Sequence, residues 1–410
     1  MRFIFLIATT FIITVHVSLS QTGWIQQNSN CSATLAAVAF LNADSGFCVG
    51  GYGKILKTTN GGSNWDSVDT PLTTHLLSVV VLNSNEVLAC GFNRTVLKSI
   101  DFGNNWYRIT NIYDGYSLNN LEFANENVGY IASQSGVILK STNSGDSWFS
   151  LQHPYPFAQE FTCLSFLDIS TGFVVGYGET LGSPIAKTTD GGISWIRYLN
   201  PTQTPLYSVK MANLDTGLIG NSYGFRRTIN GGTNWNITYT SGSFYTDIEF
   251  PTSEIAYAAG GNIVKSTDGG INWNVQYSLA NVQFGGVCFV NENTGYAVGQ
   301  NGTIMKTTSG GVVNIKMVSN FIPDKYILYQ NYPNPFNPET KIKFEINKSS
   351  FVQIKVYDIL GKEISVLVNE KLNTGVFETK FDGSDLPGGV YYYSIKAGEF
   401  EQVRKMILLK

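Results

Sequence analysis

The chain has 410 residues, a formal net charge of −3, 14% charged residues, 13% aromatic residues and 42 glycines. The aromatic content excludes an intrinsically disordered chain, and the scarcity of charge together with the excess of glycine excludes long helices and coiled coils. This composition is typical of many short strands joined by tight turns, and the length allows two or three domains.

The first twenty residues are typical of a secretory signal peptide. Arg2 supplies the positive charge, residues 3–17 are apolar, and Ser18 and Ser20 are the small residues expected before a cleavage site. The apolar run is shorter than the roughly 20 residues that span a membrane. We therefore expect residues 1–20 to direct export, and we expect no membrane span in the mature chain.

A repeat of about forty residues follows. Seven copies of a short polar motif, each opening with a basic residue, occur at residues 57–65, 98–106, 140–148, 187–195, 227–235, 265–273 and, in shortened form, 306–311. Two apolar segments precede each copy, a third runs into it and a fourth begins at its Trp, which predicts four short antiparallel strands per repeat. Seven such units predict an all-β fold, a seven-bladed β-propeller over residues 21–311.

Each complete motif has the chemistry of a locked turn. Its Asp or Asn can accept hydrogen bonds from amides of its own turn, its Gly supplies a positive φ, and its Trp offers a large apolar face. The motif resembles the Asp-box of sialidases and related propellers, which implies a structural role away from the active face. We assign that role to Asn60, Trp65, Asp101, Trp106, Asn143, Trp148, Asp190, Trp195, Asn230, Trp235, Asp268 and Trp273.

The seventh copy of the motif stops at Gly311 without a Trp, whereas Trp24 lies outside every complete copy. A propeller has to join its first blade to its last, because an open ring exposes unpaired strand edges. We therefore expect residues 22–27, which include Trp24, to form the missing fourth strand of the last blade.

A different pattern begins after the last repeat. Alternating apolar and polar residues, among them Ile342 and Phe344, predict half-buried strands in the last hundred residues. We expect a linker over residues 312–323 and a small Ig-like β-sandwich over residues 324–410.

Several motifs of this segment resemble the type A C-terminal sorting domain of type IX secretion substrates. They are QNYPNPFNPET at residues 330–340, VYDILGKEI at 356–364, LPGGVYYYSI at 386–395 and the terminal KMILLK. The resemblance implies that the type IX secretion machinery is a partner. It also implies that the protein, after transit through the periplasm, is secreted or held at the outer-membrane surface.

The propeller repeats also resemble a known family. The patterns at residues 260–273 and 295–311 are similar to those of the photosystem II stability and assembly factor-like propellers. The resemblance implies the fold, but a fold does not determine a function. An assembly-factor-like scaffold is therefore one alternative for the function.

We assign no catalytic residue, although one group of carboxylates deserves a test. Alignment of the first strands of the repeats places Glu122, Lys210 and Glu249 in one column, with Asp247 two positions before Glu249. Strand starts can face the central channel of a propeller, and two carboxylates facing each other are the machinery of a glycoside hydrolase. A polysaccharide-active enzyme that uses Glu122, Asp247 and Glu249 is thus a second alternative for the function. The structural interpretation of the same residues is that they are solvated at the channel mouth or form ion pairs.

No spacing of the five cysteines or of the histidines predicts a metal or cofactor site, and we expect neither. The scarcity of basic residues in the repeats argues against nucleic acid as a partner. Aromatic residues in the loops between blades instead favour recognition of a glycan or protein, and the candidates are Tyr116, Tyr155, Tyr207, Tyr245 and Phe284. The sequence favours an exported, non-catalytic binding module.

Overall fold

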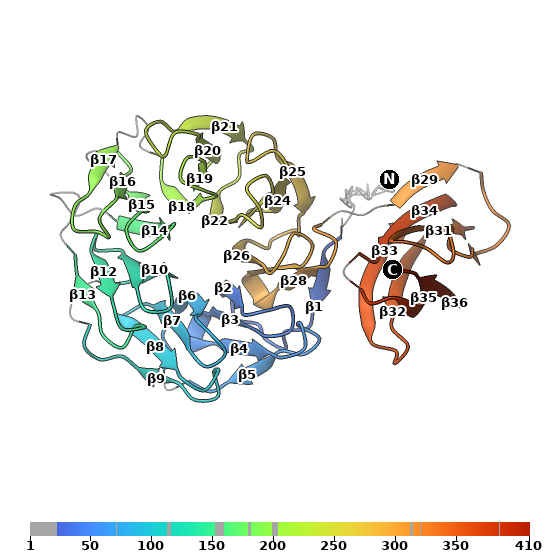
Figure 1. Ribbon diagram of the computed structural model, residues 1–410, viewed down its shortest axis with the longest axis horizontal. Coiled ribbons are helices and arrows are strands. Elements are labelled where there is room, and N and C mark those ends of the chain that lie inside the picture. The colour runs from blue at the N-terminus through green and yellow to red at the C-terminus, as the bar shows by residue number, and fades with distance from the viewer. Residues whose placement is uncertain are drawn as a thin grey trace, which may run out of the picture.

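The computed structural model describes residues 23–70, 72–112, 116–151, 160–178, 182–198, 204–311, 315–319, 321–384 and 386–410. The expected signal peptide and Tyr155 lie outside these residues. The described chain forms nine four-stranded sheets, seven in a ring and two in a smaller unit (Figure 1). The predicted all-β, seven-bladed propeller is confirmed. In the parts that the structure describes, no helix has the length and apolar character that crossing a membrane requires.

Six blades each use four strands that are consecutive in the chain and pair antiparallel in order. The first three blades contain β2 (Leu35–Phe40), β3 (Gly46–Gly50), β4 (Ile55–Thr58) and β5 (Asp66–Val68); β6 (Leu76–Val81), β7 (Val87–Gly91), β8 (Thr95–Ser99) and β9 (Tyr107–Arg108); and β10 (Leu118–Phe123), β11 (Gly129–Ser133), β12 (Ile138–Ser141) and β13 (Phe149–Ser150). The next three contain β14 (Glu160–Phe166), β15 (Gly172–Tyr177), β16 (Ile185–Thr188) and β17 (Ile196–Tyr198); β18 (Leu206–Met211), β19 (Gly217–Asn221), β20 (Gly224–Thr228) and β21 (Asn236–Thr240); and β22 (Tyr245–Glu249), β23 (Ala256–Gly260), β24 (Ile263–Ser266) and β25 (Asn274–Tyr277).

The seventh blade combines both ends of the ring. Three of its strands follow the sixth blade, namely β26 (Phe284–Phe289), β27 (Gly295–Gly299) and β28 (Ile304–Thr307), and the outermost is β1 (Ile25–Gln27). β1 pairs antiparallel with β28, with Ile25 opposite Lys306 (Figure 1). Trp24, beside β1, is 1% exposed and packs edge-on against Tyr257 and Phe289. This pairing ties the beginning of the described chain to its last repeat.

The turn between the third and fourth strands of a blade is held by its own side chains. In the fourth blade, Asp190 accepts a hydrogen bond from the Ser194 amide at 2.9 Å, and the Thr188 hydroxyl accepts one from the Gly192 amide at 2.8 Å. Hydrogen bonds from the Ser194 side chain and amide lower the pKa of Asp190 to about 2. In each of the other complete motifs, the Asn or Asp accepts the same hydrogen bond from the amide four residues further along the chain.

The basic residue that opens each motif joins neighbouring blades, a role that the sequence did not predict. Lys187 Nζ donates to the Gly231 carbonyl of the next turn at 2.8 Å, and Lys306 Nζ donates to the Gly61 carbonyl at 2.7 Å. Lys140, Arg227 and Lys265 make the same bond to the glycines that follow them around the ring. Because the bond of Lys306 returns to the first repeat, these contacts continue across the point of ring closure.

The C-terminal unit consists of two four-stranded sheets. One has the order β29 (Ile315–Ser319), β34 (Gly375–Asp382), β31 (Glu339–Ile346) and β30 (Ile327–Leu328), and the other has β33 (Glu363–Leu372), β32 (Ser350–Tyr357), β35 (Gly389–Ala397) and β36 (Phe400–Leu408). Side chains of both sheets, including Phe344 and Ile354, form one buried cluster that lies between them and contains no propeller residue. The unit is therefore a β-sandwich with its own core, and its Ig-like topology stays a prediction.

The sequence-based boundary of this unit needs a correction. Residues 312–323 were expected to form a linker, but β29 lies within that range and pairs antiparallel with β34, with Ile315 opposite Thr379. The apolar and polar residues of this short strand alternate too briefly to identify it in isolation, so only its partner strand reveals it.

Candidate functional site

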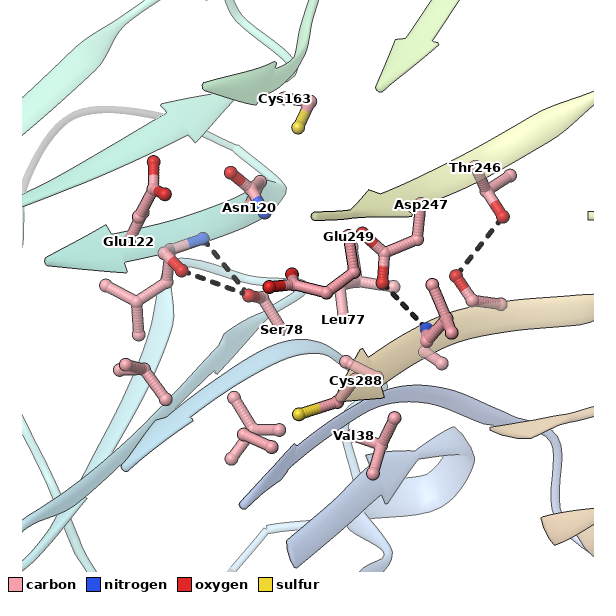
Figure 2. A pocket seen from close by; sticks show the side chains of 18 of the residues that line it. Val38, Leu77, Ser78, Asn120, Glu122, Cys163, Thr246, Asp247, Glu249 and Cys288 are labelled. Atoms are coloured by element: carbon pink, nitrogen blue, oxygen red, sulfur yellow. Dashed lines mark hydrogen bonds between the residues drawn. The ribbon is translucent and has the colours of Figure 1, made fainter. Parts of the chain in front are cut away.

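A cavity of about 400 Å³ lies in the central channel of the propeller. The innermost strands of all seven blades, β2, β6, β10, β14, β18, β22 and β26, line it. Its charged lining residues are Glu122, Lys210, Asp247 and Glu249, and Figure 2 shows the three carboxylates on two strands of its wall. The cavity is thus where the sequence-predicted carboxylates meet.

Lys210 lies between two of these carboxylates. Its Nζ is 3.3 Å from Glu122 Oε1 and 3.8 Å from Glu249 Oε2, and all three side chains are between one fifth and one third exposed. The attraction of Glu249 and Glu122 raises the pKa of Lys210, so the ammonium stays charged. Burial raises the pKa of Glu122, although Lys210 opposes that rise. The aligned column therefore forms an ion-paired group.

Two carboxylates of the cavity also bind the backbone of the next blade. Glu122 Oε2 accepts a hydrogen bond from the Phe166 amide of β14 at 2.8 Å. Asp247 Oδ2 accepts one from the Val287 amide of β26 at 2.8 Å (Figure 2). Its Oδ1 accepts one from the Ile248 amide at 3.0 Å. These side chains brace adjacent innermost strands.

Neutral side chains of the innermost strands make the same kind of brace around the ring. Asn120 Oδ1 accepts from the Leu164 amide at 3.1 Å, which is the bond of Asp247 repeated three blades earlier. Ser78, Ser165, Thr162, Ser208 and Thr246 likewise bond main-chain groups of the following innermost strand. The polar lining of the cavity is therefore largely committed to holding the ring together.

Asp247 makes the free energy of unfolding depend on pH. Burial raises its pKa to about 7, so the folded protein binds a proton on this carboxyl between roughly pH 4 and pH 7 that the unfolded chain has lost. A raised carboxyl pKa means that folding is favoured by this group at low pH and opposed as the pH rises through that window.

Substitution of Asp247 by Asn should remove this dependence. Between pH 5 and pH 8, the free energy of unfolding of the wild type is expected to fall by up to about 2–3 kcal/mol relative to that of Asp247→Asn. Asn120 shows that an amide can brace the neighbouring strand from the equivalent position. Urea titrations of both proteins at the two pH values measure the difference, and parallel curves would show that Asp247 is ionised throughout.

The thiols of the cavity are poor nucleophiles. Cys163 and Cys288 line it, and burial raises the pKa of each to about 12, which keeps both protonated at neutral pH. Among the residues that the structure describes, no group of three or more His, Cys, Asp or Glu side chains is placed to hold a metal ion.

The aromatic binding candidates fall into different environments. Tyr116 is exposed and Tyr207 is half-buried at the cavity wall, so both are open to a ligand. The prediction was wrong for Tyr245 and Phe284, which are 0% and 1% exposed. Each is the first residue of an innermost strand and turns into the core, where Tyr245 stacks on Phe225 at 4.4 Å between ring centroids.

A further aromatic group was missed by the sequence analysis. Tyr52 and Phe92 are 73% and 42% exposed, and the ring centroid of the exposed His75 lies 5.3 Å from the centroid of each. We call these three residues the aromatic triplet. Tyr52 lies in the 3-10 turn η1 (Gly51–Gly53) and Phe92 directly follows β7. The GYG sequence between two predicted strands was the available signal, because a bulky residue at a turn tip is poorly placed to join a core.

Two family models match different parts of the chain. Residues 330–409 match the secretion system C-terminal sorting domain, and residues 16–112 and 237–308 match the photosynthesis system II assembly factor YCF48. None of the curated protein sequences matches this chain.

Solved structures share the propeller fold. A structure described as YCF48 bound to D1 peptide is 19% identical, with a TM-score of 0.60, and the match covers 71% of this chain and 98% of that one. YCF48 from Cyanidioschyzon merolae is 20% identical, with a TM-score of 0.56 and coverage of 70% and 98%. PorZ, a surface component of the type IX secretion system of Porphyromonas gingivalis, is 13% identical, with a TM-score of 0.52 and coverage of 91% and 59%. The structural matches show the propeller fold, and the sorting-domain match indicates a protein that is exported by type IX secretion and is secreted or at the cell surface.

Proposed function

We propose that this protein is a non-catalytic recognition module that binds a glycan or a protein after export. The single observation that carries the proposal is the use of the cavity carboxylates. Glu122 and Asp247 bind backbone amides of adjacent blades, and Lys210 pairs with Glu122 and Glu249. A glycoside hydrolase needs one carboxyl group to protonate the leaving group and another to attack or activate water, and bracing bonds work against both tasks.

The comparisons support recognition as a use of this fold. One similar propeller, YCF48, is described with a bound D1 peptide. Another, PorZ, is described as an essential surface component of a secretion system. An assembly-factor-like scaffold would be a special case of the proposed function, because a scaffold also works by binding partners without turnover.

A polysaccharide-active enzyme is the second candidate, and one observation favours it. The pKa of Asp247 is raised to about 7, which is the range in which a carboxyl group works as a general acid at neutral pH. Glu249 lies in the same cavity and would be the second carboxylate.

Binding and turnover can be measured on the same purified full-length protein. We expect saturable retention of a glycan or protein from a panel of microbial and plant polysaccharides and cell-surface extracts, without release of reducing sugar. Release of reducing sugar that disappears in both Glu249→Gln and Asp247→Asn would contradict the proposal and favour the hydrolase. A protein that neither binds nor cleaves any member of the panel would also contradict it.

A further inference from the structure

The aromatic triplet is held rigidly at one face of the propeller, across the first two blades. The Gly51 amide donates to the Thr34 carbonyl at 2.8 Å, which fixes the turn that carries Tyr52. The Phe92 amide donates to the His75 carbonyl at 3.0 Å, which joins the other two members. Because these main-chain bonds fix the backbone that carries the rings, a ligand has only the side chains to order on binding.

Tyr52 has a left-handed backbone conformation that is unusual for a tyrosine. Its φ of 58° and ψ of 33° lie in the left-handed region, which is unfavourable for a bulky residue and better tolerated by Asn. The matching turn of the seventh blade, η2 (Gln300–Gly302), has Asn301 in the same conformation, with φ 57° and ψ 32°. Tyr52 is mostly exposed, so core burial does not offset the strain. A strained and exposed aromatic residue of this kind indicates a role in binding.

The chemistry of the triplet suits a sugar ring. The ring planes of Tyr52 and Phe92 are tilted by 41° and 39° from that of His75, so the three rings form a faceted apolar surface. The phenol and imidazole add polar groups at its edge that can bond hydroxyl groups, and none of the three side chains is a carboxylate. Stacking on the rings and hydrogen bonding at their edges together recognise a neutral carbohydrate.

The size of the surface favours an oligosaccharide over a folded protein. A stable protein interface buries about 800 Å² on each partner around an apolar centre. Polar residues interrupt the surroundings of the triplet, since Asn93 and Arg94 follow Phe92 directly and both have positive φ. The Arg94 amide donates to the carbonyl of the exposed Tyr116, so the Tyr116 backbone lies beside this turn.

We propose that the aromatic triplet is a glycan-binding platform on which neutral oligosaccharides stack. This inference rests on the proposed function, because it names the ligand class and the place for the same binding activity. The cavity carboxylates take no part in it.

The test uses the full chain and a panel of neutral oligosaccharides made of β-linked glucose, xylose or mannose, with binding followed by isothermal titration calorimetry. At least one oligosaccharide should bind, and Tyr52→Asn should weaken it by about tenfold or more. The melting temperature of Tyr52→Asn should stay the same or rise, because Asn301 already occupies the equivalent turn. Tyr223→Asn is the matched control, since Tyr223 is an exposed tyrosine in the β19–β20 turn of another blade and should leave binding unchanged.

The outcomes separate this inference from the proposed function. Oligosaccharide binding that is unaffected by Tyr52→Asn, His75→Ala and Phe92→Ala would overturn the platform but leave the recognition module standing. Binding of a peptide or protein without binding of any oligosaccharide in the panel would do the same. A chain that binds neither class would overturn both.

Discussion

Substitution of Trp24 by Ala is expected to lower the free energy of unfolding of the propeller by about 3–5 kcal/mol. Trp24 is 1% exposed and contacts Tyr257 and Phe289 of the sixth and seventh blades, so its loss leaves a large cavity beside the β1–β28 pair. All seven tryptophans precede residue 274, so tryptophan fluorescence during urea unfolding of the full chain reports on the propeller alone.

The control for ring closure is a substitution on the same strand. Gln26 is exposed on β1, and Gln26→Ser should change the free energy of unfolding by less than about 0.5 kcal/mol. Deletion of residues 23–28 should destabilise the propeller more than Trp24→Ala does, because it also removes the strand pairing. Equal stability of the wild type, Trp24→Ala and the deletion variant would show that β1 is dispensable for closing the ring.

The blades could be predicted from the sequence because their determinants are local. Six of the seven blades pair strands that are consecutive in the chain, so the apolar segments and the turn motif lie within one repeat. Even the long-range pairing of β1 with β28 could be predicted, because Trp24 lies outside every complete motif and the seventh motif has no Trp.

Contacts between blades could not be predicted in the same way. Lys306 and Gly61 are 245 residues apart, and only the curvature of the ring brings them together. Alignment of the repeats did predict that Glu122, Lys210 and Glu249 meet in the channel. It did not predict that Asp247 braces β26, because this depends on the distance between neighbouring innermost strands.

Exposure of aromatic residues was the least predictable feature. Tyr245 begins a strand whose register shifts directly after it, so burial along the strand does not follow a simple alternation that the sequence would reveal. Tyr52 lies in the turn between β3 and β4 and is largely exposed. Residue type alone does not distinguish the two, since both are tyrosines near a predicted strand end.

Removal of residues 312–410 is expected to leave a folded propeller that no longer reaches the cell surface or the medium. The C-terminal sandwich has a core of its own, formed between residues 328 and 408, and the buried clusters of the propeller contain none of its residues. Truncation should therefore change the location of the protein but not the stability of its propeller. Unfolding followed by tryptophan fluorescence should be the same for the truncated protein and the full chain. In a host with type IX machinery, the truncated propeller should be protected from added protease until the outer membrane is permeabilised.

The reciprocal experiment attaches residues 312–410 to an unrelated reporter with its own signal peptide. If the sandwich is sufficient for sorting, the reporter becomes accessible to protease on intact cells, and Ile354→Asp should abolish that gain because Ile354 is fully buried between the two sheets. Phe351→Ser, an exposed position on the same strand, is the matched control and should be sorted like the wild type. A truncated propeller as accessible as the full chain would contradict the sorting role, because export would then need only information located before residue 312.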